Sequence, residues 1–138
     1  DVTMLERSKT VYLLVKDALK RARQDAELKP VVARLTLHHW DSTRPFLPAI
    51  GFDAALVDPM FHEKKKSALP PGNMQMLQAF LGRGAELQPF LTVAQELGIR
   101  RTIVKRPRLD RAPLVNAYRP VYQLTGRSSR LDVFFNQV

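Results

Sequence analysis

Hydrophobic side chains recur along one part of the chain with helical spacing. Between residues 10 and 24 they repeat every three or four positions, and the basic side chains lie mostly between them. The apolar set is Val11, Leu14, Val15, Ala18, Leu19 and Ala22. This spacing gathers the apolar groups into one stripe, which predicts an amphipathic helix.

Shorter apolar segments show the patterns of strands instead. Leu35 and Leu37 alternate with polar neighbours, whereas DAALVD and RTIVKRP are nearly continuous apolar runs, as expected of parallel strands covered on both faces. A turn at residues 126–129 is predicted to join the last two strands. In chain order the strands are predicted within VTMLE, ARLTLHHWDS, DAALVD, RTIVKRP, PVYQLTG and RLDVFFNQV.

Two more segments are predicted to be helical. They are NMQMLQAFLGRG and LQPFLTVAQELG, and Gly98 stands where a helix commonly ends. The two prolines and the glycine of STRPFLPAIGF favour a loop or a short helix. Strands and helices thus alternate along most of the chain, which is typical of an α/β fold, and only the last pair of strands departs from that order.

The length and charge of the chain narrow the class of protein. At 138 residues it has the size of one domain. Subtracting 13 acidic residues from 22 basic ones leaves a net charge of +9. This excess favours a polyanionic partner, with nucleic acid ahead of an acidic membrane surface, while a basic protein with scattered lysines is the plainer alternative.

Several kinds of site and location are disfavoured by what the sequence lacks. The chain contains no cysteine, so it has no disulfide and no thiolate chemistry. No apolar stretch approaches the length of a membrane span, and no secretory signal is visible. His38 and His39 are neighbours on a predicted strand and should point to opposite faces, so we expect no metal site. The sequence therefore predicts a cytoplasmic protein without a metal or a membrane partner.

Polar side chains follow the first two predicted strands, at the ends where open α/β sheets bind their ligands. Glu6 can accept hydrogen bonds from both hydroxyls of a ribose, or it can serve beside a helix cap at Ser8. Trp40, Asp41 and Ser42 together can seat an adenine and accept from its amine, although Trp40 also suits a core position.

The stretch Asp58-Pro59-Met60-Phe61 follows the third predicted strand and carries the groups that activate an aromatic amine. The lone pair of such an amine is delocalised into its ring, so the nitrogen is a weak nucleophile. Hydrogen bonds from the amine to the Asp58 carboxylate and to the Pro59 carbonyl draw the nitrogen toward a pyramidal, more nucleophilic geometry. Phe61 can provide the flat surface on which an extruded base stacks.

Basic side chains follow the third and fourth predicted strands. Lys64, Lys65 and Lys66 come directly after the aromatic residue of the third strand end, and Lys105 and Arg106 end the fourth strand. We expect these side chains to contact RNA or DNA phosphates, which adds affinity but little sequence choice. A solvated run of charge is the alternative interpretation of the three consecutive lysines.

With these residues in view, the chain resembles the Rossmann-like S-adenosylmethionine-dependent methyltransferases. More narrowly, it resembles the RsmJ family of bacterial small-subunit ribosomal RNA guanine-N2 methyltransferases. The shared stretches, in matching order across essentially all 138 residues, are MLER, DPMF followed by KKSAL, IVKRP and RLDVF. The resemblance implies a class I methyltransferase sheet, mostly parallel with an antiparallel C-terminal strand, in which residues 1–138 form the C-terminal part of one methyltransferase domain.

The resemblance also implies a cofactor and the residues that hold it. Glu6 and Arg7 would contact the ribose end of S-adenosylmethionine, and Asp41 and Ser42 would contact its adenine side. Asp58 would lie against both the cofactor and the target amine. The chain departs from the family pattern at Asp41 and around RSSRLD.

A larger departure concerns the segment that precedes MLER in the family. Family members carry there a first strand ending in an acidic Gly-rich loop for the methionine part of the cofactor. The glycines of this chain form no G-x-G-x-x-G in its place. We therefore expect the first strand and N-terminal region to be missing here and to be supplied by a preceding segment of the same protein, since central strands would otherwise expose unpaired backbone groups.

The expected function is methyl transfer from S-adenosylmethionine to the exocyclic N2 of a guanine, with ribosomal RNA or the small ribosomal subunit as partner. Residues 1–138 alone are expected to be inactive. A DNA amino-methyltransferase is a second hypothesis, because Asp-Pro-x-Phe suits adenine and cytosine amines equally well. A basic RNA-binding module without enzymatic activity is the third.

Overall fold

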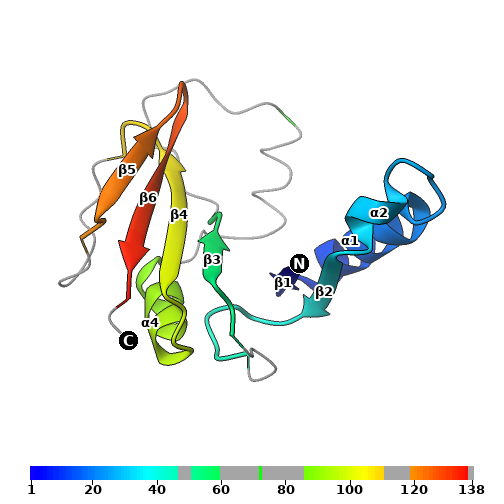
Figure 1. The fold of residues 1–138 in the computed structure, drawn as a ribbon, viewed down its shortest axis with the longest axis horizontal. Coiled ribbons are helices and arrows are strands. Elements are labelled where there is room, and N and C mark those ends of the chain that lie inside the picture. The colour runs from blue at the N-terminus through cyan, green and yellow to red at the C-terminus, as the bar shows by residue number, and fades with distance from the viewer. Residues whose placement is uncertain (47–50, 60–71, 73–85, 111–118, 137–138) are drawn as a thin grey trace. The chain divides into compact units, whose positions relative to one another are not determined.

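The computed structural model describes residues 1–46, 51–59, 72, 86–110 and 119–136. The chain divides into two compact units, Asp1–Phe46 and Leu47–Val138. Each unit has its own sheet, with two strands in the first unit and four in the second (Figure 1). The sequence predicts a mostly parallel sheet that lacks its first strand, and the described strands form two separate sheets.

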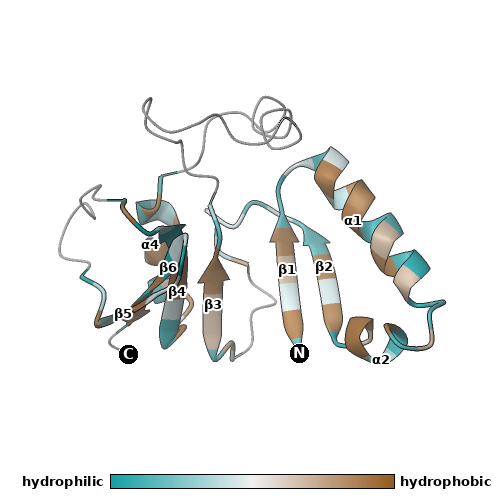
Figure 2. Cartoon of the chain, turned by 90° about the horizontal axis from the view of Figure 1, so that it is seen from above, coloured by the Kyte–Doolittle hydropathy of each residue, from teal (hydrophilic) through white to brown (hydrophobic). Residues whose placement is uncertain are grey.

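The first unit consists of two parallel strands connected by helices. The strands β1 (Val2–Glu6) and β2 (Leu35–His39) pair so that Val2 lies opposite Leu35 and Glu6 lies opposite His39. The helices α1 (Lys9–Ala22) and α2 (Lys29–Val32) lie between them in sequence (Figure 2). Because the two strands run in the same direction, the residues that follow Glu6 and His39 leave the sheet at the same edge.

The predicted amphipathic helix is confirmed in α1. Its N-cap is Ser8, whose hydroxyl accepts a hydrogen bond from the N–H of Val11 at 3.4 Å. Hydrophobic and hydrophilic bands alternate along the helix (Figure 2). No residue of α1 is buried, and Leu14 is 65% exposed, so the described residues cover little of its apolar stripe.

Sequence reasoning did not predict the short helix α2. Pro30 lies in its first turn, where the missing N–H of proline breaks no intrahelical hydrogen bond. The sequence indicates for this proline only a boundary before the second strand. A helix of four residues is too short to show a hydrophobic period in its sequence.

The second unit contains a mixed sheet with the strand order β3-β4-β6-β5. β3 and β4 are parallel, and β6 is antiparallel to both β4 and β5. This confirms the predicted antiparallel strand at the C-terminal end of the chain. The predicted helix NMQMLQAFLGRG lies outside the described residues. The described elements of this unit are β3 (Ala54–Val57), α4 (Gln88–Glu96), β4 (Arg101–Pro107), β5 (Tyr122–Thr125) and β6 (Ser129–Phe135).

The helix α4 covers one face of this sheet (Figure 1). Leu91 of the helix packs with Val104 of β4 and Phe134 of β6 in the buried core, and Val57 of β3 packs against them. Along β4 the side chains alternate between buried and more exposed positions, as a strand with one covered face requires. The face of β4 that carries Val104 therefore belongs to the core, and the face that carries Lys105 does not.

Gly98 ends α4 as the sequence predicted. Its φ of 65° lies in the left-handed region, which glycine adopts without a steric penalty. The N–H of Gly98 donates to the carbonyl of Gln95, and the N–H of Ile99 donates to the carbonyl of Ala94, both at 2.9 Å. These two bonds form a Schellman motif that turns the chain from α4 into β4.

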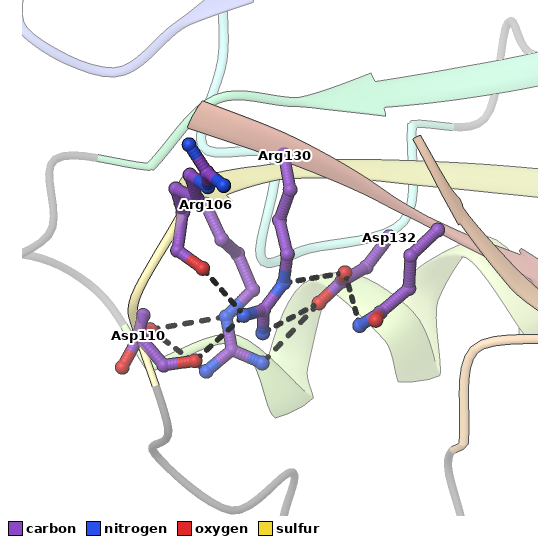
Figure 3. A network of polar contacts seen from close by, with 6 residues as sticks. Arg106, Asp110, Arg130 and Asp132 are labelled. Atoms are coloured by element: carbon purple, nitrogen blue, oxygen red, sulfur yellow. Dashed lines mark hydrogen bonds and ion pairs between the residues drawn. The ribbon is translucent and has the colours of Figure 1, made fainter. Parts of the chain in front are cut away.

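A buried network of charges lies at the end of β4 and the start of β6 (Figure 3). Arg106 and Arg130 lie directly opposite each other in the strand pairing, an arrangement that is unfavourable for like charges. Asp132, which is fully buried, accepts from Arg130 Nε at 2.8 Å and from an Arg106 terminal nitrogen at 3.4 Å. Asp110 accepts from Arg106 at 2.7 Å, so each arginine has a carboxylate partner.

Replacing Asp132 with alanine should destabilise the second unit by about 3–5 kcal/mol, because two nearly buried guanidinium groups would lose their shared carboxylate. Urea unfolding followed by circular dichroism measures this loss. The control is Asp17→Ala, which removes an exposed ion pair with Arg21 on α1 and should cost no more than about 0.5 kcal/mol. Equal losses in the two variants would contradict a structural role for the buried network.

Candidate functional site

The parallel pairing of β3 and β4 brings Asp58 next to Lys105. Val57 is the last residue of β3 and lies opposite Val104, so Asp58 follows β3 at the level of Lys105, which is still within β4. Lys105 Nζ donates a hydrogen bond to Asp58 Oδ2 at 2.8 Å. The side chain of Lys105 is 49% exposed and that of Asp58 is 57% exposed. The carboxylate therefore lies at the surface of the strand ends and not in the packed core.

The geometry leaves the carboxylate of Asp58 able to accept further hydrogen bonds. Lys105 contacts one of its oxygens, and within the described ranges no other group contacts the second oxygen, Oδ1. An exposed ion pair contributes about 0–1 kcal/mol, so an incoming donor can replace it at little cost. Asp58 can thus accept from a substrate amine either beside Lys105 or in its place.

Other residues predicted around Asp58 are only partly described. Pro59 follows directly and is half-buried. Phe61, Lys64, Lys65 and Lys66 lie outside the residues that the structure describes. The stacking role of the aromatic ring and the phosphate contacts of the three lysines thus remain predictions.

Arg106 is placed differently from the basic rim that we expected at the end of β4. Its side chain is 4% exposed, and its guanidinium group is paired with Asp110 and Asp132. Alternation along the strand explains the difference, because Arg106 points to the face that α4 covers, whereas Lys105 points to the other face. A buried and paired guanidinium is not available to bind a phosphate, so Arg106 is better described as a structural residue.

The first unit holds Glu6 at the carboxyl end of β1. One carboxylate oxygen of Glu6 accepts a hydrogen bond from the N–H of Ser8, which is the role beside the helix cap that the sequence left open. The end of β1 is also bonded to the end of β2, since the Trp40 N–H donates to the Glu6 carbonyl at 3.0 Å and His39 Nε2 lies 3.1 Å from the carbonyl oxygen of Arg7. Glu6 Oε2 has no hydrogen-bond partner among the residues described, so it can accept from a ligand hydroxyl.

Asp41 lies after β2 in a turn that fixes its carboxylate. Its Oδ1 accepts from the backbone N–H of Thr43 at 3.0 Å and from the Thr43 hydroxyl at 2.7 Å. These hydrogen bonds to the charged form lower the pKa of Asp41, and the nearby charges of Arg7 and Arg44 lower it further. Burial opposes this by a smaller amount. Asp41 is therefore held ionised as an acceptor.

An aromatic cluster lies beside these acceptors. Phe46 is 6% exposed, and its ring centroid lies 5.8 Å from that of Trp40 in an edge-on arrangement and 4.9 Å from that of His38. Trp40 remains 38% exposed and donates its indole N–H to the Arg44 carbonyl at 3.2 Å. Trp40 is thus partly a packing residue and partly a surface that a ligand can contact. Ser42, which precedes Thr43 in sequence, is half-buried.

Sequence reasoning missed Phe46 and Thr43. Thr43 had a recognisable signal, because an aspartate two residues before a threonine commonly accepts from its backbone N–H in an Asx turn. Phe46 had no such signal, since the rings that it contacts belong to β2 and to the residue that follows β2, and no local sequence pattern connects them to Phe46.

Over the described ranges, no cluster of three or more histidine, cysteine, aspartate or glutamate side chains has the arrangement of a metal site. None of the described helices is both long and apolar enough to cross a bilayer.

Comparison with known proteins gives consistent matches. The family model described as "Putative SAM-dependent methyltransferase" matches residues 1–136. The ribosomal RNA small subunit methyltransferase J of Pseudomonas aeruginosa strain LESB58 is 33% identical over 143 residues, which cover 97% of this chain and 51% of the relative. The protein of that name from Rhodopseudomonas palustris is 35% identical over 136 residues, which cover 98% of this chain and 61% of the relative.

A solved structure has a similar fold. The crystal structure of a SAM-dependent methyltransferase from Neisseria gonorrhoeae matches with a TM-score of 0.68 and 28% sequence identity. The match covers 97% of this chain and 55% of that one. The chain thus spans about half the length of the first of the curated relatives that it matches.

Replacing Thr43 with alanine should raise the pKa of Asp41 part of the way toward its ordinary value, because the hydroxyl donor is lost while the backbone N–H remains. Carboxyl-carbon NMR titration measures the shift, and Ser42→Ala is the control that should leave the pKa of Asp41 unchanged.

The same substitution has a stability consequence with a defined sign. Since the folded-state pKa of Asp41 lies below its unfolded value, its contribution to stability is complete above the unfolded pKa and is lost as the pH falls through the folded pKa. Thr43→Ala should therefore lose less stability on acidification than the wild type. An unchanged acid dependence would show that the Thr43 hydroxyl does not act on Asp41.

Proposed function

The chain belongs to the family of SAM-dependent methyltransferases, and on that premise we propose that it is part of an enzyme that methylates the exocyclic N2 of a guanine in small-subunit ribosomal RNA. The observation that carries this proposal is the Asp58 carboxylate at the end of β3, half-exposed and with one oxygen free of other contacts in the described residues. The names of the relatives, and the excess of basic residues over acidic ones, support RNA as the substrate.

Asp58 and Pro59 have the chemistry to make the guanine amine reactive. A carboxylate oxygen and a backbone carbonyl each accept one amine N–H, which reduces delocalisation of the nitrogen lone pair into the ring. The carboxylate also stabilises the positive charge that develops on the nitrogen and can receive its proton. Phe61 is proposed to stack on the base, and Lys64, Lys65 and Lys66 to contact phosphates.

The first unit is proposed to bind the nucleoside part of S-adenosylmethionine, a cofactor that supplies an electrophilic methyl group when bound. The donor and acceptor groups fit this role. Glu6 keeps one carboxylate oxygen for a ribose hydroxyl, and Asp41 is held ionised with its Oδ2 uncontacted among the described residues. Arg7 and Ser42 lie beside these acceptors in sequence, and the exposed part of Trp40 offers a flat apolar face.

A further segment of the same protein is proposed to complete the cofactor site. Within the described residues, β1 pairs only with β2 and β3 pairs only with β4, so each of these parallel strands has one edge without a strand partner. Edge backbone groups of this kind accept an added strand. An acidic Gly-rich loop after such a strand would hold the methionine part of the cofactor, for which this chain has no motif. We also propose that the protein acts in the cytoplasm, where its ribosomal RNA substrate would be found.

A DNA amino-methyltransferase is the alternative activity, because the groups around Asp58 do not by themselves distinguish guanine from adenine or cytosine. Methylation assays with RNA and DNA substrates in parallel separate the two. A basic RNA-binding module is the non-enzymatic alternative, and it should bind RNA without any response to S-adenosylmethionine.

In a chain extended by the segment that precedes MLER in its relatives, replacing Asp58 with asparagine should lower the rate of methyl transfer by about 10²–10⁴-fold, because the amide cannot receive the proton or balance the developing charge. RNA binding should change little, since one exposed carboxylate is lost. Single-turnover transfer of radiolabelled methyl groups and fluorescence anisotropy measure the two effects. Asp53→Asn, at the amino end of β3, removes the same charge and should leave transfer unchanged. Equal loss of transfer and of RNA binding in Asp58→Asn would contradict the assigned role.

The need for a completing segment predicts that residues 1–138 bind S-adenosylmethionine weakly or not at all in calorimetry. A chain extended by the segment that precedes MLER in its relatives should bind clearly. In that longer chain, Glu6→Gln should weaken binding by about tenfold through loss of a charged hydrogen bond, whereas Glu27→Gln serves as a surface control. Equally tight binding with and without the added segment would rule out its contribution.

A further inference from the structure

Two turns of the second unit lie against each other where β4 ends. The first is residues 107–110, in which the Asp110 N–H donates to the Pro107 carbonyl at 3.1 Å. The second is residues 126–129, which connect β5 to β6 and contain the hydrogen bond from the Gly126 N–H to the Ser129 carbonyl at 2.8 Å. The N–H of Arg108 donates to the Ser128 carbonyl at 3.1 Å and joins them. We call residues 107–110 and 126–129 the paired turns.

The buried charge network fixes the conformation of the first turn. One terminal nitrogen of Arg130 donates to the Asp110 carbonyl at 2.8 Å and to the Arg108 carbonyl at 3.2 Å. Arg106 binds the Asp110 carboxylate at 2.7 and 3.0 Å (Figure 3). The backbone and the side chains of this turn are therefore both bonded to arginines that β4 and β6 hold in place.

The network is better suited to fixing a conformation than to adding stability. Buried ion pairs repay the cost of removing their charges from water only with good geometry, and apolar residues of similar size are often as stabilising. Four charged side chains here do hold the turn with several hydrogen bonds. The backbone that carries the exposed side chains of this turn is therefore already held in place before any partner binds.

The paired turns present one exposed leucine and two exposed cations. Leu109 is 82% exposed, the highest value among the large hydrophobic residues that the structure describes. Arg108 and Arg127 are also exposed, and neither has a carboxylate partner among the described residues. The charges of Arg106 and Arg130, in contrast, are balanced internally by Asp110 and Asp132. A single exposed leucine is ordinary, but a leucine on paired turns that also carry two cations without carboxylate partners in the described residues is suited to bind another molecule.

We propose that the paired turns form an RNA-contact surface, in which Arg108 and Arg127 bind backbone phosphates and Leu109 packs against an unstacked base of a single-stranded segment. The inference rests on the proposed function and adds to it the region that receives the RNA. Phosphates complement the two cations, and the face of a nucleobase is the apolar surface that nucleic acid offers to a leucine. Because the turn is already ordered, binding loses little conformational entropy there.

Titration of the full chain with a fluorescent single-stranded RNA oligonucleotide at several salt concentrations tests this surface. Arg108→Gln and Arg127→Gln should each reduce the slope of log K against log salt by about 0.7, the value for one phosphate contact on a single strand. Leu109→Ala should weaken binding by roughly fivefold without changing the slope, because apolar burial is insensitive to screening at these salt concentrations.

Matched controls remove the same groups elsewhere. Arg100→Gln takes an exposed arginine from the amino end of β4, the opposite end of that strand, and Leu14→Ala removes an exposed leucine from α1. Both should leave affinity and slope close to the wild type. Circular dichroism of each variant confirms that the fold is retained, which is expected because all five side chains are exposed.

The outcomes separate this proposal from the proposed function. If the chain extended by the segment that precedes MLER methylates RNA, and the turn variants keep wild-type slopes and affinities for RNA, the paired turns are not the contact surface, although the activity stands. If the wild type binds DNA or an acidic protein but no RNA, both proposals fall. Loss of slope in Arg108→Gln and Arg127→Gln, together with a salt-independent loss in Leu109→Ala, supports the surface.

Discussion

The pairing of β4 with a neighbour on each side is the constraint from which the second unit follows. Its parallel contact with β3 sets Asp58 beside Lys105, and its antiparallel contact with β6 sets Arg106 opposite Arg130. A shift of one residue in either register would move every side chain of the strand to the other face of the sheet. Lys105 would then be buried and Arg106 exposed, and neither the candidate site nor the charge network would exist.

Alternation along β4 separates structural and functional roles between adjacent residues. Arg106, on the face that α4 covers, is committed to two aspartates and holds the turn that follows. Lys105, on the other face, stays at the surface and contacts the carboxylate that we propose to act on the substrate amine. Two basic residues that look equivalent in sequence thus have different roles. The buried charge of Arg106 requires a carboxylate partner, whereas the exposed ion pair of Lys105 can be exchanged for another contact.

Membership of the methyltransferase family agrees with what each unit offers separately. The first unit provides carboxylate acceptors and an aromatic face, and the second provides the carboxylate and the backbone carbonyl that we propose to bind an amine. The sequence contains no G-x-G-x-x-G motif, and β1 and β3 each keep one unpaired edge among the described residues. A chain that spans about half of its curated relatives therefore carries the substrate side of the proposed chemistry more completely than the cofactor side.

The sequence alone determined the features that depend on neighbours within one or two turns of chain. The spacing of Val11, Leu14 and Val15 predicted α1, Gly98 predicted the end of α4, and the apolar runs predicted β3 and β4, since helix and strand periods are local properties. It also placed Asp58 at a strand end. Tertiary structure alone decided the partners: Lys105 reaches Asp58 across 47 residues of sequence, and Arg106 reaches Asp132 across 26. Whether a charge is buried depends on which strands become neighbours, and that choice is made by long-range packing rather than by any local pattern.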